Sequence, residues 1–204
     1  MLSVFSGTLL FFFACNGGTK SDEADSETQN SESSASVEEA HKNLISGNLV
    51  RADKQFNTAV KAKGSDPNAA SGAAYMSMLQ GDYDEADSIL AAAQVANKSE
   101  IAMRRALVAL QAKDYESVKD FGLKSDLDQG KLLAAEVLIA EQELEEAINL
   151  LSDLDFKNKQ YSDLTAKYLK LIKSSDFLDH NYASAQAQWA LGQYGSAVED
   201  AASN

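Results

Sequence analysis

Residues that could carry out chemistry are few in this chain and lie far apart. Cys15 is the only cysteine, so there is no internal disulfide, no thiol pair for redox chemistry and no thiolate cluster for zinc. His41 and His180 stand near opposite ends of the sequence, and we expect both to be surface polar residues that share neither a metal nor a catalytic triad. Adjacent carboxylates such as Glu145 and Glu146 occur, but no pattern places a pair in a shaped pocket. The sequence therefore predicts a protein that is not an enzyme and needs no cofactor or metal.

The net charge of the chain argues against some classes of partner. The formal net charge is -13 at pH 7, and no stripe of Lys and Arg with interleaved aromatic residues is present, so we expect no nucleic-acid binding. The same charge argues against a polybasic face for anionic lipid, so attachment to a membrane would need an apolar or covalent anchor. An acidic group resembles calcium ligands but lacks the loop spacing and terminal Glu of an EF-hand, which favours a solvated helix face; its members are Asp82, Asp84, Glu85 and Asp87.

The N-terminal residues resemble a bacterial lipoprotein signal. Residues 4–14 form an apolar run that is too short to cross a bilayer as a helix. The run ends in Phe12, Phe13 and Ala14, directly before Cys15. As in that signal, an apolar residue stands three positions before the cysteine and a small residue stands directly before it. The resemblance implies a signal peptide over residues 1–14, diacylglyceryl transfer to the Cys15 thiol, cleavage before Cys15, and acylation of the new amino group by a fatty acid such as palmitate.

Residues 15–35 are predicted to be a disordered acidic tether. They are almost wholly Gly, Ser, Thr, Asn, Gln, Asp and Glu, a composition that cannot bury a core. Several acyl chains, at about 0.8 kcal/mol per buried methylene, would hold an acidic domain on a membrane through such a tether. We expect the protein in the bacterial cell envelope, on the periplasmic face of the outer membrane or, given the acidic cluster at 20–25, on the cell surface. The alternatives are a secretory leader without lipidation, or a misplaced start that makes Cys15 an incidental thiol.

Residues 36–204 are predicted to form one all-α domain. The apolar spacing from about residue 37 is helical, and Pro67 is the only proline in the chain. Asp66 before Pro67 predicts a helix start. Asn97 with Glu100 predicts a second start by a capping box, and a weaker box is predicted at residues 125–128.

One short sequence pattern, which we call the recurring phrase, occurs five times along this domain. Each copy has a turn residue, then Tyr or Leu two positions on, then Ala or, in the third copy, Val three further on, and an alanine lies seven positions before each turn residue. The turn residues are Gly47, Gly81, Lys113, Gln142 and Gly192, and the alanines are Ala40, Ala74, Ala106, Ala135 and Ala185. These features are similar to the inter-helix turn and helix contact of tetratricopeptide repeats, and the first two copies are 34 residues apart, which is that family's period. The resemblance implies a solenoid of helical hairpins, irregular toward the C-terminus, where residues 161–174 are predicted to be an extra helix.

The resemblance also implies a concave groove lined by the first helix of each hairpin. Its inward positions begin at His41 and Leu44, and the candidate partner-binding residues that follow are Tyr75, Met78, Met103, Leu107, Leu110, Glu136, Ile139, Tyr182, Gln186 and Trp189. Met and aromatic side chains suit adaptable contact with a peptide or helix. An apolar stripe at helical spacing is also typical of packed core, here filled by the extra helix, and both interpretations stay open.

The leading hypothesis from the sequence is a membrane-anchored, non-catalytic scaffold that binds a protein or peptide in the bacterial cell envelope. Its layout is similar to that of tetratricopeptide lipoproteins that assist outer-membrane protein or pilus assembly. The alternative is a structural homo-oligomer or a fixed subunit of an envelope assembly complex.

Overall fold

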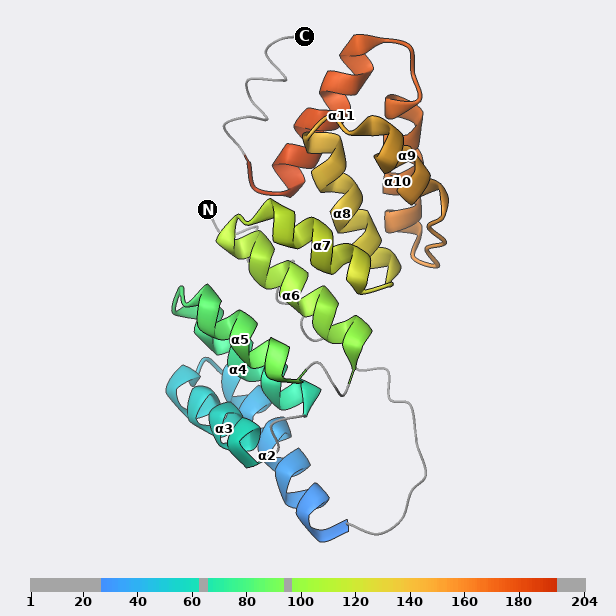
Figure 1. Cartoon of the computed structure of the whole chain (residues 1–204). Coiled ribbons are helices and arrows are strands. Elements are labelled where there is room, and N and C mark those ends of the chain that lie inside the picture. The colour runs from blue at the N-terminus through green and yellow to red at the C-terminus, as the bar shows by residue number, and fades with distance from the viewer. Residues whose placement is uncertain (1–26, 63–65, 94–96, 194–204) are drawn as a thin grey trace. The chain divides into compact units, whose positions relative to one another are not determined.

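The computed structural model describes residues 27–62, 66–93 and 97–193 (Figure 1). Within these ranges the chain forms ten helices and no strand, which confirms the all-α prediction. The chain divides into two compact units, residues 1–112 (unit 1) and residues 113–204 (unit 2), and each is described by itself.

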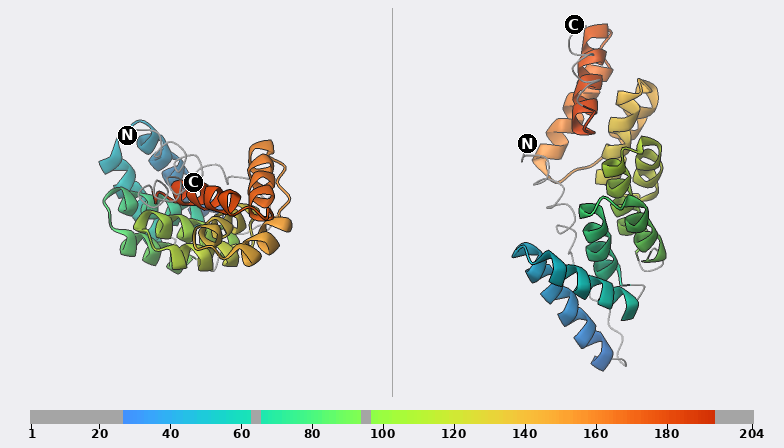
Figure 2. Two further views of the ribbon diagram at one scale, coloured as in Figure 1. Left: turned by 90° about the horizontal axis from the view of Figure 1, so that it is seen from above. Right: turned by 90° about the vertical axis from the view of Figure 1, so that its left-hand side faces the viewer.

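Unit 1 is a series of helices in which each packs against the next along the chain. The helices are α2 (Glu27–Ile45), α3 (Leu49–Ala62), α4 (Pro67–Leu79), α5 (Tyr83–Ala93) and α6 (Lys98–Ala112). Helix α4 also contacts both α2 and α6, so alternate helices form one layer; the blue to green helices lie in chain order in both views of Figure 2. The core of this unit includes Phe56, Leu90 and Ile101, whose side chains are fully buried.

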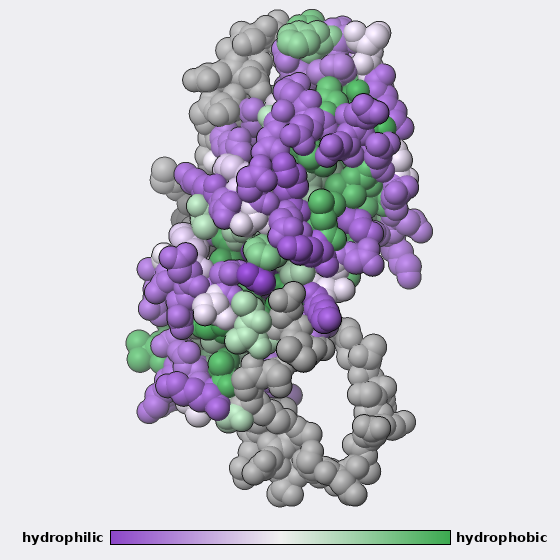
Figure 3. All heavy atoms as spheres, in the orientation of Figure 1, coloured by the Kyte–Doolittle hydropathy of each residue, from purple (hydrophilic) through white to green (hydrophobic). Residues whose placement is uncertain are grey.

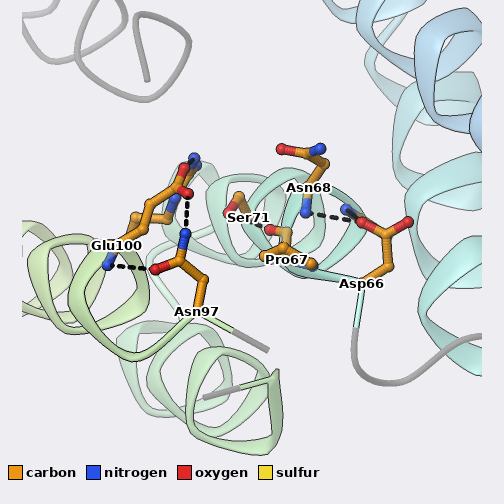
Figure 4. A network of polar contacts seen from close by, with 8 residues as sticks. Asp66, Pro67, Asn68, Ser71, Asn97 and Glu100 are labelled. Carbon is orange, nitrogen blue, oxygen red and sulfur yellow. Dashed lines mark hydrogen bonds and ion pairs between the residues drawn. The ribbon is translucent and has the colours of Figure 1, made fainter. Parts of the chain in front are cut away.

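The predicted helix starts of unit 1 are confirmed (Figure 4). Asp66 is the N-cap of α4, and its carboxylate accepts hydrogen bonds from two backbone N–H groups of the first turn, at 2.9 and 3.2 Å, while Pro67 occupies the first helical position. Before α6, Asn97 Oδ1 accepts from the Glu100 N–H at 3.2 Å, and Asn97 Nδ2 donates to Glu100 Oε2 at 2.8 Å. Both caps satisfy amide groups that a helix end otherwise leaves without a partner.

The recurring phrase marks the places where the chain turns. All five predicted turn residues have left-handed backbone conformations: Gly47 (φ 78), Gly81 (φ 80), Lys113 (φ 62), Gln142 (φ 64) and Gly192 (φ 78). After α4, for example, the Gly81 N–H donates to Met78 O and the Asp82 N–H donates to Ser77 O, both at 3.0 Å, which is the Schellman pattern of helix ends. The five predicted alanines are also buried: Ala40, Ala74, Ala106, Ala135 and Ala185.

Unit 2 departs from a simple series of hairpins. Its helices are α7 (Tyr115–Lys124), α8 (Asp128–Ala140), α9 (Leu144–Ser152), α10 (Lys159–Ile172) and α11 (Phe177–Ala190). Helices α7, α8 and α9 pack consecutively, α10 lies against α9 and α11, and α11 returns to pack on α8. The extra helix predicted at residues 161–174 is therefore present as α10.

Helices α7 and α8 approach closely through small residues. A Cβ on Gly122 would lie 2.6 Å from the Gly130 carbonyl oxygen. Ser125 is fully buried between them, where its hydroxyl donates to Gly122 O at 2.7 Å and accepts from the Leu127 N–H at 3.2 Å. The predicted capping box at residues 125–128 is wrong, because the N-cap residue of α8 is Leu127 and Ser125 belongs to the turn.

Helix α2 begins inside the predicted tether. Residues 27–35, for which the sequence predicts disorder, continue the helix that runs to Ile45; extending an existing helix costs far less than starting one. Cys15, the predicted signal peptide over residues 1–14, tether residues 15–26 and the C-terminal residues 194–204 lie outside the described residues.

Candidate partner-binding site

The candidate groove residues of unit 1 are mostly buried. Tyr75 on α4 and Met103 and Leu107 on α6 are less than a tenth exposed. Met78 packs against the core cluster formed by α4, α5 and α6, and Leu110 is half-buried. Burial also raises the pKa of the Tyr75 hydroxyl. In this unit the predicted positions contribute to packing, and little of their surface is open to a partner.

The candidate residues on α8 of unit 2 are covered as well. Ile139 is fully buried and Glu136 is 8% exposed. Ile139 belongs to a cluster with Tyr168 and Ile172 of α10 and with Ala183 and Ala187 of α11. Packed core, the alternative that the sequence left open, describes α8 in this structure.

Glu136 is a buried carboxyl group with one hydrogen-bond partner among the described side chains. The Tyr168 hydroxyl donates to Glu136 Oε1 at 3.3 Å. Burial raises the pKa of Glu136 from 4.5 to about 7, and the hydrogen bond from Tyr168 opposes this rise. Burial and the nearby carboxyl group likewise raise the pKa of Tyr168. A neutral carboxyl that accepts from a tyrosine can join α8 to α10 inside an apolar cluster without burying a charge.

Helix α11 presents the exposed part of the predicted site. Tyr182 is 46% exposed and Trp189 is 61% exposed. Leu178, which is 50% exposed, lies one helical turn before Tyr182, and the three positions fall within about 40° of one another around the helix at 100° per residue. We call Leu178, Tyr182 and Trp189 the α11 face. Gln186, the remaining candidate, is half-buried, and its Nε2 donates to the Tyr182 hydroxyl at 3.4 Å.

The exposed residues of α11 have one chemical character. Five side chains of this helix are exposed, and none of them is charged: Phe177, Leu178, Tyr182, Trp189 and Ala190. Such a surface is unusual in a chain of net charge -13, and an exposed apolar patch with a polar surround is typical of an interaction site. Figure 3 shows hydrophobic groups reaching the surface between hydrophilic ones on the visible face of unit 2.

A lysine of the neighbouring helix α10 flanks this face. The Lys167 ammonium lies 5.3 Å from the centroid of the Tyr182 ring, within the range of a cation–π contact. Lys159, Lys167 and Lys170 are all exposed, and Asp163 is the only acidic residue in α10. None of these three lysines forms an ion pair with another described residue, whereas Lys119, for example, lies 3.0 Å from Glu141.

Sequence reasoning missed part of this site. Leu178 precedes Tyr182 by four residues, so helical spacing alone could have included it. Lys167 could not be found in this way, because its approach to Tyr182 depends on how α10 packs against α11. That packing is specified by buried contacts between residues far apart in the chain.

Other residues with possible chemistry have structural roles. In the acidic group at the start of α5, Asp82 accepts from the Glu85 N–H at 3.0 Å, and Asp87 forms a bidentate pair with Arg105 of α6 at 2.7 and 2.8 Å. His41 and His180 are both half-buried, against the expectation of surface residues, and the His41 ring lies 5.0 Å from that of Phe56. Burial, and to a lesser extent the nearby Arg104, lower the pKa of His41.

No group of three or more His, Cys, Asp and Glu side chains in the described ranges is arranged to hold a metal ion. Among the helices of the described ranges, none is both long and apolar enough to span a bilayer. Comparison with protein-family models finds no match for the chain, and comparison with curated proteins finds none either.

Proposed function

We propose that this protein is a non-catalytic helical-repeat scaffold of the tetratricopeptide type that binds a protein or peptide partner. We further propose that it does so in the bacterial cell envelope, held on a membrane through acylated Cys15. The lipid anchor rests on the sequence around Cys15 alone.

The regular recurrence of turns and helix contacts supports the repeat assignment. A left-handed residue lies at each of the five predicted turns, and a buried alanine lies seven positions before it. The hairpins α2–α3 and α4–α5 follow one another in unit 1, with contacts between the first helices of both. This is the arrangement expected when each repeat buries its apolar side against the next.

The α11 face is the observation that carries the binding proposal. Tyr182 and Trp189 occupy positions at which the family resemblance places partner contacts, and both expose about half of their surface or more. Large aromatic side chains supply much of the binding energy of protein interfaces when a partner covers them. A face of this kind needs a macromolecular partner because a single exposed helix side offers no concave pocket for a small molecule.

Site-specific photo-crosslinking in the native host would test this proposal. A photoreactive amino acid in place of Tyr182 should give a discrete adduct with a second protein species. The matched control places the same amino acid at Lys61, an exposed position of α3 in unit 1, where we expect no such adduct. Absence of an adduct at position 182 would contradict the proposal, and an adduct made only of two copies of this chain would favour the homo-oligomer instead.

A further inference from the structure

We propose that the α11 face and the lysines of α10 together bind an amphipathic protein segment whose polar side is acidic. This inference rests on the proposed function and names the chemical class of the partner. The surface consists of Leu178, Tyr182 and Trp189 on α11, with Lys167 and Lys170 on α10, and we call it the α10–α11 surface.

The apolar half of this surface fits a short helix. Leu178 and Trp189 are eleven positions apart on α11, which at 1.5 Å per residue spans roughly 16 Å, or three helical turns. An amphipathic segment with apolar residues at helical spacing would cover this length with three or four side chains. The aromatic rings of Tyr182 and Trp189 offer large contact area at low cost in side-chain entropy.

The cationic half specifies the charge of the partner. Lys167 and Lys170 are exposed, and neither forms an ion pair with a described residue. Lys167 also stands 5.3 Å from the Tyr182 ring, so a carboxylate bound to its ammonium would lie beside the apolar face. The chain as a whole carries a net charge of -13, so an acidic segment is repelled by most of the molecule and attracted here. Charge complementarity of this kind governs specificity and association rate.

The polar residues bordering the α11 face favour a protein partner over a lipid surface. Asp179 lies one position after Leu178 and is half-buried, and Gln186 donates to the Tyr182 hydroxyl at 3.4 Å. An aromatic centre with a polar rim is the usual composition of protein interfaces. Pressing the same surface into a bilayer would require desolvation of the Asp179 carboxylate, which membranes penalise strongly.

Fluorescence titration of the full-length protein in a non-ionic detergent would test the inference, because Trp189 is the only tryptophan in the chain. The probe is a 14-residue peptide, blocked at both ends and free of Trp, with Leu and Phe on one helical side and Glu on the other. We expect a saturable blue shift of the Trp189 emission. The same peptide with Lys in place of every Glu should bind at least about tenfold more weakly.

Charge-reversal variants locate the site. The double variant Lys167→Glu/Lys170→Glu should weaken binding of the acidic peptide by roughly tenfold or more. The matched control is Lys54→Glu/Lys61→Glu, which reverses two exposed lysines of α3 in unit 1 and should stay within about twofold of wild type, apart from a small long-range effect. The Trp189→Ala variant lacks the fluorescent residue, so its affinity is measured by the anisotropy of a labelled peptide. We expect its affinity for the acidic peptide to fall by roughly tenfold or more.

Three results would overturn the inference: equal affinity for the acidic and the lysine peptide, equal losses in the α10 and α3 double variants, or a Trp189 shift given by phosphatidylglycerol vesicles and not by the acidic peptide. The two proposals fail separately. If position 182 crosslinks to a partner but the protein shows no preference for the acidic peptide, the scaffold proposal stands and the acidic class of partner is excluded. If the protein binds the acidic peptide selectively but no partner is crosslinked, the proposed surface chemistry stands and the scaffold proposal is contradicted.

Discussion

At the scale of single residues, Glu136 is the most unusual group in the described structure. Its carboxyl is buried in an apolar cluster, accepts a hydrogen bond from Tyr168 and has a pKa of about 7. The unfolded chain binds a proton at this residue only below about 4.5. Between these two values the folded state holds a proton that the unfolded state has lost, so stability falls as the pH rises through this window.

We therefore expect the substitution Glu136→Gln to remove part of the pH dependence of stability. The shift from 4.5 to about 7 corresponds to roughly 3 kcal/mol of unfolding free energy. An amide keeps an acceptor for Tyr168 but does not ionise, so the variant should match wild type near pH 5 and exceed it near pH 8 by about 2–3 kcal/mol. Urea unfolding at both pH values measures the difference. Equal effects of the substitution at both pH values would show that Glu136 does not titrate in this window.

The sequence identified Glu136, Tyr182 and Trp189 by position but did not separate buried from exposed. The family pattern assigns all three to the same kind of position on the first helix of a hairpin, which is why one periodic pattern selected them together. Their difference arises because α10 and α11 cover the Glu136 side of α8, whereas Tyr182 and Trp189 lie on the exposed part of α11. A periodic pattern shows which residues share a helix face, whereas the element that covers the face is decided by tertiary packing.

At the scale of elements, the turns were predicted well because their cause is local. A chain that reverses direction within a few residues of a helix end commonly uses a left-handed residue there, and glycine takes that conformation without strain. The five predicted turn residues all have φ between 62 and 80. Lys113 and Gln142 show that the surrounding helices hold this conformation even where the residue is not glycine.

Two reciprocal substitutions test this account of the turns. Gly81→Ala should destabilise unit 1 by about 1 kcal/mol, because alanine is strained at φ 80. Gln142→Gly should stabilise unit 2, by up to about 1 kcal/mol, since glycine relieves the strain at φ 64 although it adds entropy to the unfolded chain. Chemical denaturation measures whether the unfolding free energy falls in the first variant and rises in the second. A destabilising effect of Gln142→Gly would mean that contacts of the glutamine side chain outweigh the backbone strain.

The contact between α3 and α4 leads to a further prediction. A Cβ at Gly72 would overlap the ring of Phe56, which is fully buried. We expect Gly72→Ala to lower the unfolding free energy by about 1–3 kcal/mol, since a packed ring cannot move aside without strain. Adding Phe56→Leu makes room, so the double variant should be more stable than the sum of the single effects predicts. Strict additivity of the two changes in urea unfolding would contradict the overlap.

At the scale of the whole molecule, composition and period gave the all-α class and the hairpin spacing, but not the arrangement of unit 2. The irregular stretch was visible between residues 155 and 181, where the repeated phrase is missing. That α10 lies against α9 and α11, and that α11 returns to α8, depends on contacts between distant residues such as Tyr168 and Glu136. The net charge of -13 is a sum over the chain, so it does not show where positive charge gathers, such as the exposed lysines of α10.

The proposed anchor leads to a prediction for the intact protein. Natively expressed wild type should begin at Cys15, carry added acyl mass and occur in the membrane fraction, because several acyl chains are needed for stable attachment. The variant Cys15→Ala should lack the acyl mass and leave that fraction. Intact-mass spectrometry with cell fractionation measures both. Retention of residues 1–14, or a wild type without lipid, would exclude the anchor while leaving the helical scaffold unaffected.

The most direct test of the central claim is the native mass of the assembly that contains this protein. The wild type and the triple variant Leu178→Ser/Tyr182→Ser/Trp189→Ser, which changes only exposed positions, would be extracted from the native host in mild detergent and compared by mass photometry. Binding through the α11 face predicts that wild type occurs in a heavier assembly with a second protein, and that the folded triple variant is released as a single mature chain, whose protein part is smaller than the 21.9 kDa of the full sequence. Assemblies of identical mass for both proteins, or a mass that is a simple multiple of this chain alone, would contradict a partner-binding scaffold.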